Sequence, residues 1–308
     1  MSVRRTVAAP GDTGRAYSDV VGDLVALTGR TATVDTRSGL VQIDLDTVAL
    51  ARVAPPSTAD ELALEAVAAA GWRPQESGAV GGWILRAAAG FTARANSVLP
   101  LHPPGMPLDE ALGLARDWYS ERGLPLRLAV PMEARRLLDA ELGERGWPAD
   151  PPVEVLAARL DLLAAAGRSP DTVEVSESVD DAWLGLYRGG AGLQPAGRAL
   201  LTRHERVAFA TVRRDGAVVA VGRGVVDDGW LGIGAVEVEP AHRRDGLGTA
   251  VMSALWDWGR ARGASRGYLQ VSTDNAPALA LYERLGYWQH HAYRYRTDPS
   301  SPFPDRSS

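Results

Sequence analysis

The sequence predicts a mixed α/β (α+β) fold preceded by a small β-rich module, and three features of the residue pattern indicate this. Residues 16–53 contain short segments in which apolar and polar residues alternate, as in a sheet with one buried face. From residue 57 onwards, helical and strand-like segments alternate, which is typical of packed α/β layers. The chain has 308 residues and single cores stop growing at about 250–300 residues, so we expect more than one domain.

The N-terminal module is expected to be an SH3-like, barrel-like β module over residues 16–55. Its predicted strands are 20–26, 31–36 and 40–45, with glycine-containing turns between them. In the third strand Val41, Ile43 and Leu45 alternate with polar residues, which indicates one buried face. Residues 1–15 are predicted to be disordered. We expect the module to serve stability or docking rather than chemistry.

The region 57–165 is expected to form an α/β domain. Ser57, Thr58 and Asp60 can cap a helix that begins near Glu61. Most of the segments that follow end at Gly or Pro, which interrupt regular structure. In chain order we expect a helix in 61–71, two strands in 81–101 with a turn at 89–90, a helix in 108–123, a strand in 124–131, a helix in 133–147 and a strand in 154–163.

A linker near 164–171 separates this region from a second α/β domain, expected over 171–297. Its predicted elements are a strand and a helix in 173–190, a hairpin in 207–226, a strand in 230–238, a helix from about 246, a strand in 268–271, a helix from about 275 and a strand after 286. Residues 298–308 are predicted to be a disordered tail.

Composition excludes several kinds of chemistry. There is no cysteine, which removes disulfides, thiolate metal ligands and a cysteine nucleophile. All 33 residues of the Lys+Arg count are arginine, so a Schiff-base lysine and a P-loop lysine are absent. The net charge of -5 disfavours non-specific nucleic-acid binding.

No apolar run approaches the roughly 18 residues of a membrane span. No apolar run follows Arg4 and Arg5 as it would in a signal peptide, so a cytoplasmic location is expected.

The most informative stretch joins a strand that ends at Val238 to a helix that begins near Gly246. Between them lies Arg243-Arg244-Asp245-Gly246-Leu247-Gly248. Two glycines at such a junction let backbone N–H groups point outwards at a helix N-terminus, which makes an anion site suited to a pyrophosphate. Arginines there can add charge-assisted hydrogen bonds.

A second motif follows across the next predicted strand, helix and strand: Asn275, Ala278, Leu281-Tyr282 and Gly286-Tyr287. Together the two motifs resemble those of the GNAT (GCN5-related) N-acetyltransferase superfamily. Its acyl-CoA signature is Arg or Gln, two residues, Gly, one residue, then Gly or Ala, and Arg243, Gly246 and Gly248 fill these positions. The resemblance implies a catalytic GNAT domain over 171–297, with acetyl-CoA as co-substrate and no metal.

The whole chain also resembles actinobacterial GNAT proteins that carry a small β module and a degenerate first GNAT-like half ahead of the active half. The implied degenerate half is 57–165, whose elements follow the order of an incomplete GNAT fold. This half has no Arg-x-x-Gly-x-Gly loop. It is therefore not expected to hold CoA in the usual way.

The resemblance also implies which residues bind CoA. They lie on one strand, the loop and the following helices: Val236, Val238, Arg243, Arg244, Gly246, Gly248, Thr249 and Asn275. The two valines are implied to pair with the pantetheine arm through their backbone, and the loop residues to hold the pyrophosphate. Asn275 is implied to bond the CoA arm, which is compatible with capping its own helix.

Two residues are candidates for proton transfer. Tyr282 matches the family tyrosine near the sulfur, which makes it the candidate general acid for the departing thiolate. Glu237 is the candidate base, because strand alternation turns it to the face opposite Val236 and Val238; a water chain is the alternative. His290 and His291 are adjacent on a predicted strand, so we expect them on opposite faces and not in one metal site.

These observations predict an N-acetyltransferase that moves an acetyl group from acetyl-CoA to a primary amine by direct attack. The expected partners are acetyl-CoA and an amine acceptor, either a small molecule or a protein, with no membrane and no nucleic acid; a monomer and an oligomer both fit the sequence. One alternative is a tandem enzyme that resembles mycothiol synthase. Another is a non-catalytic acyl-CoA sensor or scaffold. Nucleic-acid association through the β module ranks last, because the module has few basic and aromatic residues.

Overall fold

A computed structural model describes residues 2–7, 16–52, 54–163, 171–190 and 195–303. The chain divides into two compact units, Met1–Pro56 and Ser57–Ser308, and each is described by itself. In the part of the chain that the structure describes, no helix is long and apolar enough to span a membrane.

The described residues of the N-terminal unit form six strands. They are β1 (Ser2–Val7), β2 (Ala16–Val21), β3 (Asp23–Thr28), β4 (Thr31–Thr36), β5 (Gly39–Asp44) and β6 (Val48–Arg52). They form two open three-stranded sheets, β2-β1-β6 and β3-β4-β5, so the predicted barrel is not confirmed.

Disorder was expected for residues 1–15, but Ser2–Val7 forms β1, because it pairs with both β2 and β6. Residues 8–15 lie outside the described chain. Buried Val3, Val34 and Ile43 lie in its small core.

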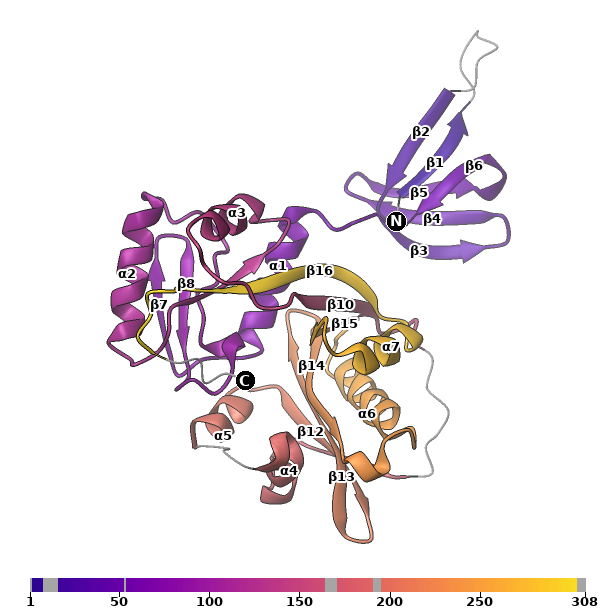
Figure 1. Cartoon of the computed structure of the whole chain (residues 1–308). Helices are drawn as coiled ribbons and strands as arrows, with labels where there is room; N and C mark the ends of the chain where they lie inside the picture. The colour runs from indigo at the N-terminus through magenta and orange to yellow at the C-terminus, as the bar shows by residue number, and fades with distance from the viewer. Residues whose placement is uncertain (1, 8–15, 53, 164–170, 191–194, 304–308) are drawn as a thin grey trace. The chain divides into compact units, whose positions relative to one another are not determined.

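The second unit is built on one eight-stranded sheet (Figure 1). Its order is β11-β12-β13-β14-β15-β10-β16-β9, and among these neighbours only β14 and β15 run parallel. The strands are β9 (Arg127–Pro131), β10 (Val153–Arg159), β11 (Val173–Ser176), β12 (Val207–Arg214), β13 (Ala217–Asp227), β14 (Trp230–Val238), β15 (Arg266–Ser272) and β16 (Trp288–Thr297). β10 separates β15 from β16, so strands from both predicted halves share one sheet. The division at 165–171 stays a prediction, since residues 164–170 are not described.

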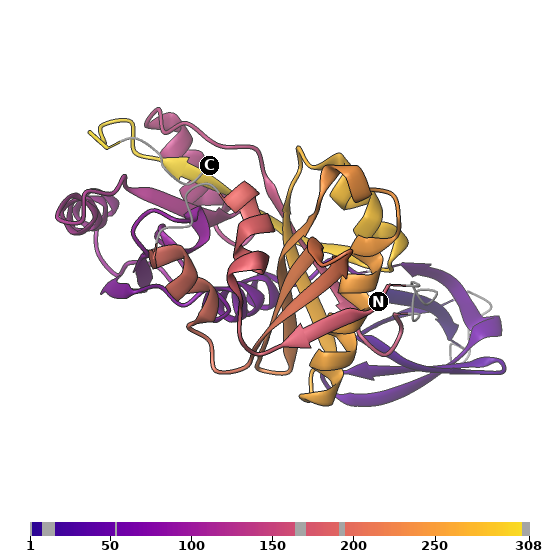
Figure 2. The same ribbon diagram turned by 90° about the horizontal axis from the view of Figure 1, so that it is seen from below.

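Helices cover both faces of this sheet (Figures 1 and 2). They are α1 (Thr58–Ala70), α2 (Leu108–Ser120), α3 (Arg136–Glu144), α4 (Asp181–Leu186), α5 (Pro195–Thr202), α6 (Leu247–Ala261) and α7 (Ala276–Arg284). On one face, Val251 and Leu255 of α6 pack against buried residues of β12–β15. On the other face, Trp183 of α4 and Leu200 of α5 pack with Phe209. Burying apolar residues on both faces makes these strands read as nearly continuous apolar runs.

Local sequence signals explain where several elements begin and end. Ser57 caps α1 through a capping box, in which its hydroxyl accepts from the Asp60 N–H and the Asp60 carboxylate accepts from the Ser57 N–H. The predicted turn at 89–90 is present and follows β8 (Trp83–Ala87), but the strand expected after it forms only isolated bridges, such as the one between Ile84 and Leu99. β8 pairs instead with β7 (Glu76–Val80), which precedes it. The predicted disordered tail is corrected at Asp298, which is buried and accepts hydrogen bonds from Arg116 and Ser300.

A histidine pair, half-buried His290 and buried His291, joins β16 to α1. His291 Nε2 lies 2.9 Å from Glu65 Oε1, and the Nδ1 atoms of His290 and His291 are 2.8 Å apart. The expectation that the two histidines face opposite sides is therefore wrong. The pairing of β10 with β16 shifts register between Val155 and Leu156, and such a bulge breaks the alternation of side chains. Within the described residues, no group of three or more His, Cys, Asp or Glu side chains is arranged to hold a metal.

This pair predicts a dependence of stability on pH. Burial, and secondarily the charge of His291, lower the pKa of His290 to about 4, whereas an unfolded histidine titrates near 6.5. The unfolded chain thus binds the proton more readily than the folded chain does. The stability that depends on a neutral His290 is therefore complete above pH 6.5 and is lost as the pH falls toward 4. We expect urea unfolding at pH 7 and pH 5 to show a larger loss for the wild type than for His290→Gln. Equal losses in the two proteins would contradict this role.

Candidate active site

β14 and β15 separate at the centre of the sheet. Their parallel pairing runs only from Trp230–Arg266 to Ile233–Leu269, although β14 continues to Val238. On the other side of β14, Arg223 pairs with Gly234 and Val221 with Glu237. β14 therefore has one extra residue there, which is a β-bulge.

The bulge holds Ala235 at φ 52°. A positive φ costs free energy in any residue with a side chain, and such outliers cluster at functional sites. The bulge thus marks the place where β14 leaves its neighbour and its backbone groups turn toward open space.

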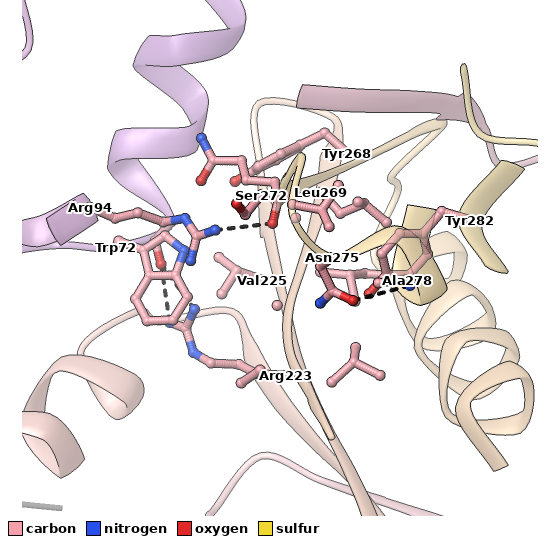
Figure 3. A pocket seen from close by; sticks show the side chains of 18 residues that line it. Trp72, Arg94, Arg223, Val225, Tyr268, Leu269, Ser272, Asn275, Ala278 and Tyr282 are labelled. Atoms are coloured by element: carbon pink, nitrogen blue, oxygen red, sulfur yellow. Dashed lines mark hydrogen bonds between the residues drawn. The ribbon is translucent and has the colours of Figure 1, made fainter. Parts of the chain in front are cut away.

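A cavity of about 230 Å³ lies at this separation (Figure 3). Its lining comes from the end of α1, the segment after β8, strands β13, β14 and β15, and helix α7: Gly71, Trp72, Arg94, Arg223, Val225, Gly232, Ile233, Gly234, Ala235, Val236, Tyr268, Leu269, Gln270, Val271, Ser272, Asn275, Ala278 and Tyr282. The cavity is slightly smaller than the 300–1,000 Å³ typical of ligand sites. It can hold the reactive end of a long substrate together with a small second reactant.

The glycine-rich loop ends at the start of α6, as the sequence predicts. Gly246 is the residue before the helix, with a left-handed φ of 80°, and no side chain caps the first turn. Arg244 also has a positive φ of 72°. A first helical turn without a side-chain cap leaves backbone N–H groups and the positive end of the helix dipole for an anion. Arg214, from the β12–β13 hairpin, donates to Asp245 Oδ2 at 2.5 Å and also pairs with Asp171, so it offsets part of the negative charge beside the loop.

The structure brings part of the predicted CoA set together. Val236 lines the cavity, and Val236 and Val238 both pack on the α6 side of the sheet. Gly248 and Thr249 lie in the first turn of α6 and are half-buried. Arg243 is exposed, and its Nε donates to Val238 O at 3.4 Å.

Asn275 and Tyr282 line the cavity from α7. Asn275 is the N-cap of α7, where its Oδ1 accepts from the Ala278 N–H at 3.2 Å; its amide nitrogen points away from the helix (Figure 3). Burial raises the pKa of Tyr282 above its usual value of 10, although the charge of Arg94 opposes the shift. The phenol is therefore protonated at neutral pH, which is the state that a proton donor needs.

Glu237 lies outside the cavity lining. Its Oε2 accepts a 2.8 Å hydrogen bond from the backbone N–H of Arg188, on the sheet face opposite α6. The tight turn after α4 presents this N–H, with Arg188 at φ 56°. Glu237 thus lies next to the β14 bulge, with its carboxylate bound to the turn after α4.

Of the residues that line the cavity, the sequence predicted only Val236, Asn275 and Tyr282. Trp72, Arg94 and Arg223 line the cavity, and Arg223 is only 3% exposed. Its Nη1 and Nη2 donate to Gly71 O at 3.1 Å, and its Nε donates to Leu201 O at 2.8 Å. The one available signal was an arginine inside the apolar run of β13, since buried arginines are rare.

Comparison with known proteins identifies the family. The family model described as "Probable histone acetyltransferase Rv0428c C-terminal" matches residues 58–296. The chain belongs to this GNAT acyltransferase family. "Probable histone acetyltransferase Rv0428c" of Mycobacterium tuberculosis is 32% identical over 288 residues, which cover 90% of this chain and 88% of that protein. "Uncharacterized N-acetyltransferase YobR" of Bacillus subtilis is 28% identical over 241 residues, with 76% and 96% covered.

Solved structures agree on the GNAT fold. A GCN5-related N-acetyltransferase from Kribbella flavida superposes with a TM-score of 0.61 at 20% identity and covers 80% of this chain and 97% of its own. A tandem GNAT protein from the clavulanic acid biosynthesis pathway superposes with a TM-score of 0.56 at 14% identity, with 82% and 91% covered. The family assignment and these neighbours bear out the GNAT fold predicted from the two motifs.

Proposed function

We propose that this GNAT protein transfers an acetyl group from acetyl-CoA to a primary amine, in the cytoplasm, at the cavity between β14 and β15. The main support for the proposal is that an anion site and a cavity lie at the two ends of one gap in the sheet. The first turn of α6, which has no side-chain cap, offers an anion site beside the end of β14, and the gap between β14 and β15 leads from there into the cavity.

The site's residues fit acetyl-CoA as a substrate. The backbone of residues 244–249 would bind the pyrophosphate, with Arg243 adding charge at its side. The backbone of Val236 and Val238 would pair with the pantetheine arm as a neighbouring strand does. Asn275 would donate its amide N–H to the same arm, because its oxygen already serves as the helix cap.

The reaction proposed is a direct displacement. The neutral amine attacks the acetyl carbonyl carbon, a C–N bond forms, and the C–S bond breaks to release CoA thiolate. Tyr282 donates its phenolic proton to that sulfur, and its pKa, raised by burial, keeps it protonated until then. Glu237 takes the proton of the amine through water, since its carboxylate lies next to the cavity rather than in it.

The acceptor is the open part of the proposal. The name of the mycobacterial relative designates a histone, which is a protein acceptor. The size of the cavity suits a small amine instead. The test is the release of free thiol from acetyl-CoA with a panel of small amines and lysine-containing peptides, using the full chain. We expect release only when an amine of the right class is present. Tight acetyl-CoA binding without release for any amine would contradict catalysis.

A further inference from the structure

The cavity lining has an unbalanced charge. Among the described residues, the lining contains two arginines, Arg94 and Arg223, and no Asp, Glu or His. The remaining polar groups of the lining are neutral tyrosine, serine and amide side chains. A positive charge in a partly closed cavity interacts strongly with a ligand, because the protein screens it less than water does.

Arg223 has carbonyl groups but no carboxylate as partners among the described residues. Its three hydrogen bonds go to the backbone oxygens of Gly71 and Leu201. Burial lowers its pKa to about 10, so the guanidinium still carries its charge at neutral pH. A guanidinium has five N–H donors, which leaves two for a further acceptor.

Arg94 also forms no ion pair among the described residues, although the Tyr293 hydroxyl is a polar neighbour of its side chain. Its Nη2 donates to Gln270 O at 3.0 Å, and its Nε is buried with no hydrogen-bond partner in the described part of the chain. Trp72 lies between the two arginines, with its ring centroid 5.9 Å from Arg94 Cζ and 4.8 Å from Arg223 Cζ (Figure 3). The indole holds both cations in place and offers no negative charge.

A buried cation without a counter-ion is costly, and an anion supplied by a ligand offsets that cost. Neighbouring positive charge also lowers the pKa of an acceptor ammonium, which favours the neutral amine that attacks. An acceptor with additional cationic groups would instead be repelled. The offset of the buried positive charge and the repulsion of further cationic groups both favour an acceptor that carries an anion close to its amine.

We propose that the acceptor is a small amine bearing an anionic group, of the carboxylate or phosphate class, and that Arg94 and Arg223 bind this group beside Trp72. The proposal rests on the acetyl transfer proposed above. It assigns the substrate class and excludes lysine-rich protein segments from this cavity. Charge-assisted hydrogen bonds typically contribute about 1.5–3 kcal/mol, so loss of the anion should weaken kcat/KM by roughly 10- to 150-fold.

The experiment uses pairs of acceptors that differ chiefly in the anion, and kcat/KM is compared per neutral amine, because removing the anion also changes the pKa of the amine. Glycine, L-alanine and L-phenylalanine are compared with their amides, O-phosphoethanolamine with ethanolamine, and a lysine-rich peptide serves as the cationic arm. Amine-dependent thiol release gives kcat/KM. We expect at least one anionic member to exceed its neutral partner about tenfold or more. A phosphate preference would identify the phosphate class, and a carboxylate preference the carboxylate class.

Variants connect the preference to the site. Arg94→Gln should reduce the anionic preference at least about fivefold, and Arg94→Lys should retain part of it. The matched control is Arg122→Gln, because Arg122 also stacks on a tryptophan, Trp118, but pairs with Glu76 outside the cavity lining. The Arg122→Gln variant should prefer anionic over neutral acceptors as strongly as the wild type does. Equal kcat/KM for all pairs, or a faster lysine-rich peptide, would overturn the proposal.

A binding measurement separates this proposal from the proposed function. Acetyl-CoA binding is measured by calorimetry, and the N-acetylated forms of the same amines are then titrated into the CoA-saturated protein. If no acceptor turns over but the anionic forms bind about tenfold more tightly than their neutral partners, the anion site stands and the acetyl transfer fails. If the anionic forms do not bind more tightly and no acceptor turns over, the anion site is refuted as well.

Discussion

Tyr282→Phe is expected to lower kcat by about 10²–10³-fold while acetyl-CoA binding stays within about twofold of the wild type. The reason is that proton donation to a departing group typically contributes 10²–10⁴-fold, and the substitution removes the hydroxyl that we assign this task. The ring is kept, so its contact with Tyr287, at a centroid distance of 6.2 Å, is unchanged. The measurement is steady-state thiol release together with calorimetric binding of acetyl-CoA.

The matched control is Tyr287→Phe. Tyr287 is the neighbouring buried tyrosine, and its hydroxyl accepts from Trp256 Nε1 at 3.0 Å instead of lining the cavity. This variant should lose roughly 1 kcal/mol of stability, as is typical for one hydrogen bond, and retain most of kcat. A kcat for Tyr282→Phe within threefold of the wild type would contradict the assigned role.

The same tyrosine predicts the alkaline limb of the pH profile. Burial raises the pKa of Tyr282 above 10, so the donor loses its proton only above that value. We therefore expect the kcat of the wild type to show no decline from Tyr282 between pH 7 and pH 9.5. A fall in kcat centred near pH 8 that disappears in Tyr282→Phe would show that the pKa is lowered instead.

Gly248→Glu is expected to weaken acetyl-CoA binding at least about 100-fold. A Cβ at position 248 would lie 3.4 Å from Leu281 Cδ2 and 3.9 Å from Val238 Cγ2, which are ordinary contacts. The variant should fold, because a carboxylate in the first turn of a helix interacts favourably with the helix dipole. That carboxylate would compete with the pyrophosphate for the backbone N–H groups and repel it.

Gly248→Ala is the matched variant for this position. It adds the Cβ without the charge, so acetyl-CoA affinity should stay within about fivefold of the wild type. Calorimetric titration of the three proteins gives the comparison. Unchanged affinity in Gly248→Glu would place the pyrophosphate away from α6.

The sequence predicted the parts of the site that depend on neighbouring residues. The loop from Arg243 to Gly248 and the cap at Asn275 follow from local backbone requirements, namely a left-handed glycine before α6 and a side-chain acceptor at the start of α7. The same locality explains why most helices and strands of the second unit were found near their predicted positions.

The parts that were missed depend on contacts between distant segments. β10 lies between β15 and β16, and no local pattern specifies which strand is its neighbour. Arg94 and Arg223 are 129 positions apart in the chain. They meet only because the end of α1 and the segment after β8 pack against β13 and β15. Likewise, β1 forms because β2 and β6 pair with it, which its own residues do not reveal.

A crystal structure of the full chain with bound CoA tests the central claim most directly, because it locates both ends of the substrate at once. We predict the pyrophosphate at the first turn of α6, within hydrogen-bond distance of backbone N–H groups in 244–249. The pantetheine arm should lie between β14 and β15. Its sulfur should lie within about 4 Å of the Tyr282 hydroxyl, because proton donation requires a hydrogen bond between the two groups. CoA bound elsewhere, or a sulfur directed away from Tyr282 and the cavity, would contradict the account.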